Sequence, residues 1–149
     1  MSEPKWIMIC GGPRTGKSTL ARKMAKELGA TGLLLTDDFL SIKDRGERIE
    51  SIASSLKREF AYGRLTIIEG CEAPRLLDRL ALFNLPHPHR VVWVGPVLVS
   101  QYEPKYRALV ATQINKISGA MDIDLLKEFN AFTYEGNLVY VPSYNPRSD

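Results

Sequence analysis

The sequence has few of the features of secreted, membrane-bound or strongly basic proteins. It contains only two cysteines, Cys10 and Cys71, among 149 residues, too few for the disulfide framework of a small secreted domain. We find no apolar run of membrane-spanning length, no leader-type segment, no repeat and no low-complexity tract. We therefore expect a cytoplasmic protein with reduced cysteines and no membrane contact.

An excess of charge of one sign is also missing. The net charge is +3, which suits an anionic ligand but is too small to indicate nucleic acid. Apolar residues make up 44% and charged residues 25% of the chain, as in ordinary soluble proteins. The length allows one compact domain with a real core, so we expect residues 1–149 to form a single domain.

The most informative stretch lies near the start of the chain. Residues 11–18 fit the pattern G-x-x-x-x-G-K-S/T, directly after an apolar run at residues 6–10. Leu20, Met24 and Leu28 then recur every four residues, which indicates a helix that ends near Gly29. A strand, a glycine-rich loop and a helix are the context that a phosphate-binding loop requires.

The chemistry explains this spacing. Glycines let the backbone curl so that successive N–H groups point at a phosphate, and the following helix N-terminus carries partial positive charge. Lys17 is expected to reach the β- and γ-phosphates, Ser18 to bind Mg²⁺, and Thr19 to donate to the α-phosphate. The expected nucleotide-binding residues are Gly11, Gly12, Pro13, Arg14, Thr15, Gly16, Lys17, Ser18 and Thr19.

Strand and helix patterns alternate along the rest of the chain. Short apolar runs predict further strands at 32–36, 64–68, 90–94 and 137–141. Amphipathic spacing predicts helices from residue 49 to about 63, at 72–83, within 102–118 after Pro104, and at 122–129. This alternation predicts an α/β fold with a five-stranded parallel sheet and helices on both faces.

Three sets of polar residues follow predicted strands. They are the phosphate loop, the pair Asp37-Asp38, and Glu69, which precedes Gly70. Ligands of parallel sheets bind beyond the carboxyl ends of the strands. We therefore expect these residues to converge on one site.

With these three motifs in this order, the chain resembles small P-loop kinases of the nucleoside and nucleotide kinase type. Asp37-Asp38-Phe39 resembles the D-D-F of nicotinamide riboside kinases and the D-S-F of uridine kinases and phosphoribulokinase, and Glu69-Gly70 resembles the E-G that ends their third strand. The resemblance implies the three-layer P-loop NTPase fold with strand order 2-3-1-4-5. Its motifs cover about the first half of the chain.

Two departures from the family pattern matter. Polynucleotide 5′-hydroxyl kinases also carry an acid pair after the second strand, but an arginine follows it closely, whereas here Phe39-Leu40 follows. Related kinases place arginines over the phosphates from a segment after the fourth strand. The corresponding stretch here, around residues 95–108, contains only Lys105 and Arg107 as cations. It suggests a short lid with Arg107 as the candidate catalytic cation.

The resemblance also assigns roles at the strand ends. Asp37 aligns with the first acid of the family tripeptide and is the expected base for a hydroxyl acceptor. Asp38 is expected to hold a magnesium-bound water, and Glu69 to bind Mg²⁺ through water or to contact the substrate. The alternative is that the acid pair only caps a turn. Candidate contacts elsewhere are Lys43 and Arg45 for the acceptor or lid, and Tyr140, Tyr144 and Arg147 for adenine.

The sequence therefore favours a Mg²⁺-dependent kinase. It would transfer the γ-phosphate of ATP, or of another NTP, to a hydroxyl of a small molecule such as a nucleoside, nucleotide or related metabolite. A polynucleotide 5′-hydroxyl kinase is the enzymatic alternative, so nucleic acid is a less favoured partner. An ATP-binding regulatory module with slow or no hydrolysis is the alternative from another class.

Overall fold

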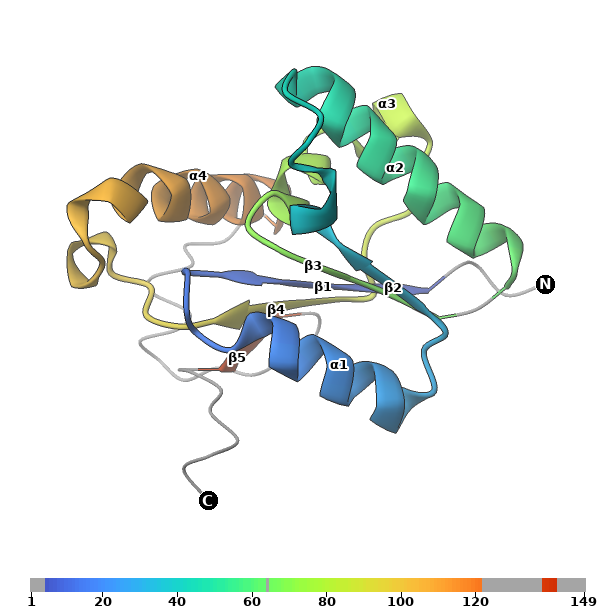
Figure 1. Cartoon of the computed structure of the whole chain (residues 1–149), viewed down its shortest axis with the longest axis horizontal. Coiled ribbons are helices and arrows are strands. Elements are labelled where there is room, and N and C mark those ends of the chain that lie inside the picture. Colours follow the sequence, from blue (N-terminus) through green and yellow to red (C-terminus); the bar gives the residue numbers. More distant parts are fainter. Residues whose placement is uncertain (1–4, 64, 122–137, 142–149) are drawn as a thin grey trace.

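A five-stranded parallel sheet forms the centre of the computed structural model, which describes residues 5–63, 65–121 and 138–141 (Figure 1). The strand order is β2-β3-β1-β4-β5, as expected. The strands are β1 Trp6–Gly11, β2 Gly32–Leu35, β3 Thr66–Glu69, β4 Arg90–Val94 and β5 Leu138–Val141. The predicted three-layer α/β architecture of P-loop NTPases is confirmed.

Helices cover both faces of this sheet (Figure 1). The helix α1 (Lys17–Leu28) lies on one face, and α2 (Arg45–Ala61), α3 (Leu80–Phe83) and α4 (Pro104–Met121) lie on the other. Successive side chains of a strand point to opposite faces. Thus Ile7 and Ile9 of β1 pack in the core beneath α1, whereas Trp6, Met8 and Cys10 belong to the larger core beneath α2 and α4.

The register of the strands brings the predicted site residues to one edge of the sheet. Glu69, the last residue of β3, pairs with Ile9 of β1 and with Leu35 of β2. The phosphate loop begins two residues after Ile9, and Asp37 follows two residues after Leu35. Three chain segments far apart in sequence therefore meet where their strands end.

Local signals account for the end of α1 and the start of α2. As expected, α1 ends at Gly29, which adopts the left-handed conformation with φ 69°. The sequence interpretation began α2 at Ile49, but the helix already begins at Arg45. Asp44 caps it by accepting a hydrogen bond from the backbone N–H of Glu47 at 2.9 Å. The cap lies in a polar stretch without regularly spaced apolar residues. A prediction based on hydrophobic periodicity therefore does not detect the first turn of α2.

The helix predicted at 72–83 is wrong as a single element. The chain instead forms the 3₁₀ helix η2 (Ala73–Leu76) and the short α3, separated by residues 77–79, of which Arg79 has a φ of −126°. The adjacent residues Leu76 and Leu77 are both buried, as is Leu80. One α-helical face does not bury neighbouring residues equally well, and the break after η2 lets Leu77 and Leu80 reach the core from a separate turn of the chain.

Some sequence expectations fall outside the described residues. These are the helix at 122–129, Asn137 at the start of the last strand, and the terminal residues Tyr144 and Arg147. Within the described part of the chain, no helix combines the length and hydrophobicity needed to cross a membrane. Cys10 and Cys71 are both free thiols.

Candidate active site

The loop between β1 and α1 has the curled backbone of an anion-binding concavity. Gly11, Arg14 and Gly16 adopt positive φ angles of 138°, 58° and 89°. A Cβ atom on Gly11 would lie 2.0 Å from the carbonyl oxygen of Val94, so only glycine fits where β1 passes this close to β4. Residues with positive and negative φ angles alternate along the loop. Such a backbone turns its N–H groups toward the centre of the loop, next to the N-terminus of α1.

A pocket of about 270 Å³ opens above this loop. Its volume is close to the lower end of the range for small-molecule sites. The Lys17 side chain is buried and its Nζ donates to the carbonyl oxygen of Gly12 at 2.5 Å. The pocket is lined by Pro13, Arg14, Thr15, Gly16, Lys17, Ser18, Thr19, Asp37, Glu69, Gly70 and Cys71.

Ser18 and Glu69 meet on one side of the pocket. The Ser18 hydroxyl donates to Glu69 Oε1 at 2.7 Å, and Glu69 is 4% exposed. Hydroxyl and carboxylate oxygens are hard ligands of the kind that Mg²⁺ prefers. Within the described ranges, no group of three or more His, Cys, Asp or Glu side chains is arranged to hold a metal ion by itself. A cation bound mainly by substrate phosphates and water requires no such cluster.

The acid pair divides between the pocket and its outer surface. Both aspartates lie in the 3₁₀ helix η1 (Thr36–Phe39) and both are exposed, but among the described residues Asp37 lines the pocket and Asp38 does not. A Cβ atom on Gly70 would lie 1.7 Å from Thr36 Oγ1. The glycine after Glu69 therefore lets η1 approach β3, which places Asp37 beside Glu69 at the pocket.

Neither cation of the expected lid segment lines this pocket. Arg107 donates through Nε to the carbonyl oxygen of Tyr102 at 3.0 Å and through a terminal nitrogen to that of Ser100 at 3.4 Å. Lys105 forms an exposed ion pair with Glu103 at 3.6 Å. Arg107 thus holds the turn around η3 (Val99–Gln101) before α4. Its role as a catalytic cation stays a prediction.

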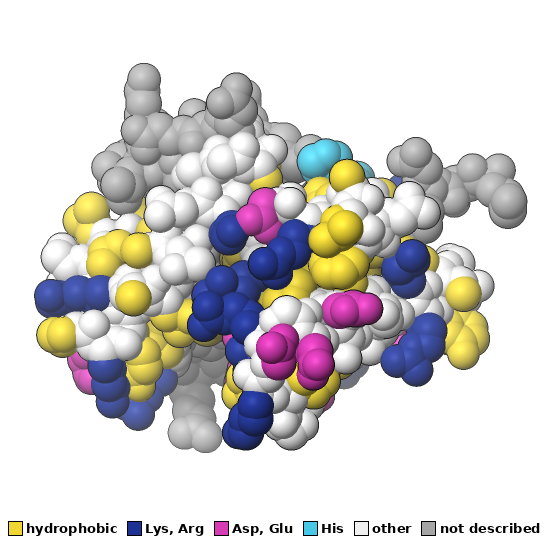
Figure 2. All heavy atoms as spheres, turned by 90° about the horizontal axis from the view of Figure 1, so that it is seen from above, with side chains coloured by type: hydrophobic (Ala, Val, Ile, Leu, Met, Phe, Trp, Pro, Cys, Tyr) yellow, Lys and Arg dark blue, Asp and Glu magenta, His cyan; other side chains and the backbone are white. Residues whose placement is uncertain are grey.

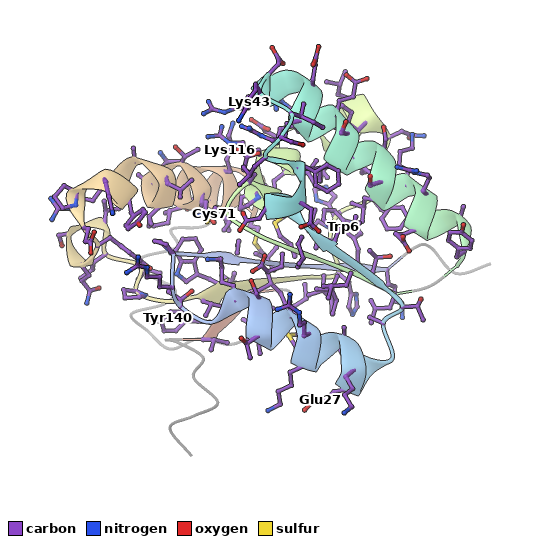
Figure 3. The ribbon with its side chains drawn as sticks, viewed as in Figure 1. Trp6, Glu27, Lys43, Cys71, Lys116 and Tyr140 are labelled. Atoms are coloured by element: carbon purple, nitrogen blue, oxygen red, sulfur yellow. The ribbon has the colours of Figure 1, made fainter. Side chains whose placement is uncertain are left out.

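Cys71 is a pocket residue that the sequence interpretation did not single out. Its Sγ lies 3.7 Å from the carbonyl oxygen of Gly11, and Figure 3 shows it on the α2 and α4 side of the sheet. Burial raises the pKa of the Cys71 thiol, and the nearby Lys17 ammonium only partly offsets this. Burial likewise raises the pKa of Cys10. Both side chains are therefore neutral thiols at physiological pH, with little nucleophilic character.

Two residues that support the loop were also missed. Gln113 in α4 is 1% exposed and binds both backbone groups of Gly11: its Oε1 accepts from Gly11 N–H at 3.0 Å and its Nε2 donates to Gly11 O at 2.9 Å. Tyr102 packs against Gly12, where an added Cβ would lie 2.1 Å from its ring, and its hydroxyl donates to Pro96 O at 2.6 Å. Burial raises the pKa of Tyr102 to about 12, so it acts as a neutral donor.

Replacing Gln113 with methionine should destabilise the protein by about 2–5 kcal/mol, because it leaves both backbone groups of Gly11 without this buried polar partner. Chemical denaturation measures the loss. Thr112→Ala, which removes an exposed hydrogen bond within the same helix, is the matched control and should change stability by less than about 1 kcal/mol. A Gln113→Met protein as stable as this control would contradict the inferred clamp.

Comparison with known proteins agrees with this fold. No protein-family model matches the chain, and no curated protein matches it. Among solved structures, a gluconokinase from Sinorhizobium meliloti superposes with a TM-score of 0.54 at 18% identity, covering 99% of this chain and 87% of the gluconokinase. A protein described as a kinase from Chloroflexus aurantiacus gives 0.53 at 18% identity, with 94% and 88% covered.

The chain has the fold of small P-loop kinases. At this level of identity the likeness concerns the fold alone. The argument for an activity therefore rests on the residues of the pocket.

Proposed function

We propose that the protein is a kinase that transfers the γ-phosphoryl group of ATP, or of another NTP, to a hydroxyl of a small molecule. One observation carries this proposal: a single pocket contains the phosphate loop with Lys17, the Ser18–Glu69 pair, and Asp37. Phosphate binding needs only the first of these, whereas transfer to a hydroxyl also uses a metal ligand set and a base.

The described residues fit a nucleoside triphosphate and Mg²⁺. The curled loop and the start of α1 offer N–H donors, and the Lys17 ammonium already lies against the loop. We propose that Ser18 and Glu69 hold Mg²⁺, Glu69 through water or directly. When bound, Mg²⁺ neutralises charge on the β- and γ-phosphate oxygens. Thr19, which also lines the pocket, would donate to the α-phosphate.

Asp37 is the residue proposed to accept the proton of the acceptor hydroxyl. Its carboxylate lies at the pocket and is exposed, so it can accept a hydrogen bond from a hydroxyl that binds next to the terminal phosphate. The exposed Asp38 would act at most through a water on the metal. We further propose that residues 1–149 act as one domain whose lid segment spans residues 95–108.

A transfer assay from γ-labelled ATP identifies the acceptor. The panel should contain nucleosides, nucleotides, sugars, sugar acids and oligonucleotides with a 5′-hydroxyl. We expect label to appear on one class of small molecule and only weak, strongly salt-sensitive binding of oligonucleotides. Efficient labelling of the oligonucleotides, or label released only as inorganic phosphate, would contradict the proposal.

A further inference from the structure

A cluster of arginines lies beside the phosphate-loop pocket. We call Arg45, Arg48, Arg75 and Arg79 the arginine cluster. Arg45 and Arg48 begin α2, Arg75 is in η2, and Arg79 precedes α3. In Figure 2, Lys and Arg side chains gather across the middle of the face that α2 and α4 present. Figure 3 places Lys43 and Lys116 on this same side of the sheet.

The members of the cluster are close enough to affect one another. Burial lowers the pKa of Arg75, and the neighbouring guanidinium groups of Arg45, Arg79 and Arg48 lower it further, while Glu72 opposes them. Arg48, Arg75 and Arg79 are only partly exposed. Like charges therefore share a partly desolvated surface, where their repulsion is screened less than on an open face.

The cluster contains more positive charge than its surroundings neutralise. Glu72 is already paired with Arg48 at 2.8 Å, and Arg48 also donates to the carbonyl oxygen of Ile42 at 3.1 Å. Asp78 is paired with Lys116. Within the described part of the chain, Arg45, Arg75 and Arg79 have no carboxylate within ion-pair distance. Guanidinium groups bind phosphate and carboxylate oxygens in pairs of parallel hydrogen bonds, so this arrangement suits an oxyanion.

The cluster and the pocket adjoin one another. Cys71 lines the pocket, and the next residue, Glu72, holds Arg48 of the cluster. Arg75 follows Cys71 by four residues in tight turns of about 2 Å rise per residue, so their Cα atoms lie within about 8 Å. None of the four arginines lines the pocket itself, so a molecule bound by both would extend from Asp37 past Cys71 and Glu72 to the arginines.

We infer that the acceptor is an anionic small molecule whose phosphate or carboxylate group is bound by Arg45, Arg75 and Arg79 while its hydroxyl lies at Asp37. This inference rests on the proposed function. In the transfer, the acceptor O–H bond breaks and its proton passes to the Asp37 carboxylate. The acceptor oxygen forms a bond to the γ-phosphorus, and the bond from that phosphorus to the β-phosphate oxygen breaks, which releases a nucleoside diphosphate.

Binding of inorganic phosphate tests the site without catalysis. The titration uses Lys17→Ala protein, in which the phosphate loop has lost its cation, with and without the additional changes Arg75→Ala and Arg79→Ala. We expect these two changes to weaken phosphate binding at least tenfold. Arg22→Ala, an exposed arginine of α1 on the opposite face, should change it less than twofold. Equal weakening by Arg22→Ala, or none by the double change, would overturn the inference.

Thermal unfolding separates a binding role from a structural one. Because the arginines repel one another, the Arg75→Ala/Arg79→Ala protein should melt at the same temperature as the unmodified protein or higher. If the melting temperature falls by several degrees, the arginines stabilise the fold and the assigned binding role is wrong.

Matched acceptors test the assignment during turnover. Each pair consists of a neutral molecule and its anionic counterpart, such as a nucleoside with its monophosphate or a sugar with its sugar acid. We expect the anionic member to be preferred, and its kcat/KM to fall 10- to 100-fold in the Arg75→Ala/Arg79→Ala protein while that of the neutral member stays within twofold.

The other outcomes overturn the inference in distinguishable ways. Preference for the neutral member would contradict the inference of an anionic acceptor but would agree with the kinase proposal. If no acceptor is phosphorylated while the cluster still binds phosphate, the kinase proposal is wrong. The inferred role of the arginines in binding an acceptor is then wrong as well. Efficient phosphorylation of a 5′-hydroxyl oligonucleotide that depends on the cluster would assign the arginines to nucleic acid.

Discussion

Lys17→Ala protein should lose phosphoryl transfer by about 10³-fold or more while it keeps its fold. The Lys17 ammonium is the cation of the phosphate loop, and transfer places negative charge between the β- and γ-phosphates, where this cation stabilises it. Among the described residues, the Lys17 ammonium donates to the Gly12 carbonyl oxygen alone, and the loss of one such hydrogen bond costs about 1 kcal/mol. Single-turnover transfer from labelled ATP and thermal unfolding measure the two effects.

Lys26→Ala is the matched control for this prediction. Lys26 is exposed in the last turn of α1, at the opposite end of the helix from the phosphate loop. The Lys26→Ala substitution removes the same charge from the same helix. The transfer rate of this variant should stay within about twofold of that of the unmodified protein. A folded Lys17→Ala protein with full activity would contradict the assignment of the phosphate loop.

Asp37→Asn should keep nucleotide affinity within a few-fold and reduce the rate of transfer by about 10²–10⁴, the usual contribution of a positioned base. Asparagine keeps the size and hydrogen bonding of the side chain but has no carboxylate to accept a proton. The phosphate loop, which binds the nucleotide, is unchanged. Calorimetry measures the affinity, and single-turnover kinetics with the identified acceptor measures the transfer.

Asp38→Asn is the natural comparison, because both residues are exposed acids of η1 but only Asp37 lines the pocket. The Asp38 change should slow transfer far less, and added Mg²⁺ should partly restore the rate if Asp38 holds a metal-bound water. If Asp37→Asn transfers phosphate at the unmodified rate, the base is another residue, and Glu69 is the remaining carboxylate of the pocket.

The parts of the site that the sequence predicts are local or are set by strand ends. The phosphate loop is contiguous, so its curvature follows from its own glycines. Asp37 and Glu69 follow buried strands, and parallel pairing in register brings such positions together without knowledge of any side-chain contact. Predicting these features required only the hydrophobic periodicity of the sequence and its resemblance to a family.

The parts that the sequence does not predict depend on contacts between distant segments. Gln113 and Gly11 are 102 residues apart, and Gln113 lies within the apolar stripe of α4, where only its polar character distinguishes it. The arginine cluster combines residues of α2 with residues of η2 and of the segment that follows it. The break between η2 and α3 determines where Arg75 and Arg79 lie relative to α2. The hydrophobic periodicity predicts one continuous helix over residues 72–83. The clustering of the arginines therefore does not follow from the sequence alone.

The dependence of ATP consumption on the acceptor tests the central claim most directly. Formation of nucleoside diphosphate is followed with and without the acceptor, alongside the phosphorylated product, in the unmodified protein and in the Lys17→Ala and Asp37→Asn variants. We predict that nucleoside diphosphate and phosphorylated acceptor form in equal amounts, only with acceptor present, and that both variants suppress them together. ATP binding accompanied by slow, acceptor-independent hydrolysis that Asp37→Asn does not change would contradict the account and identify an ATP-binding module instead.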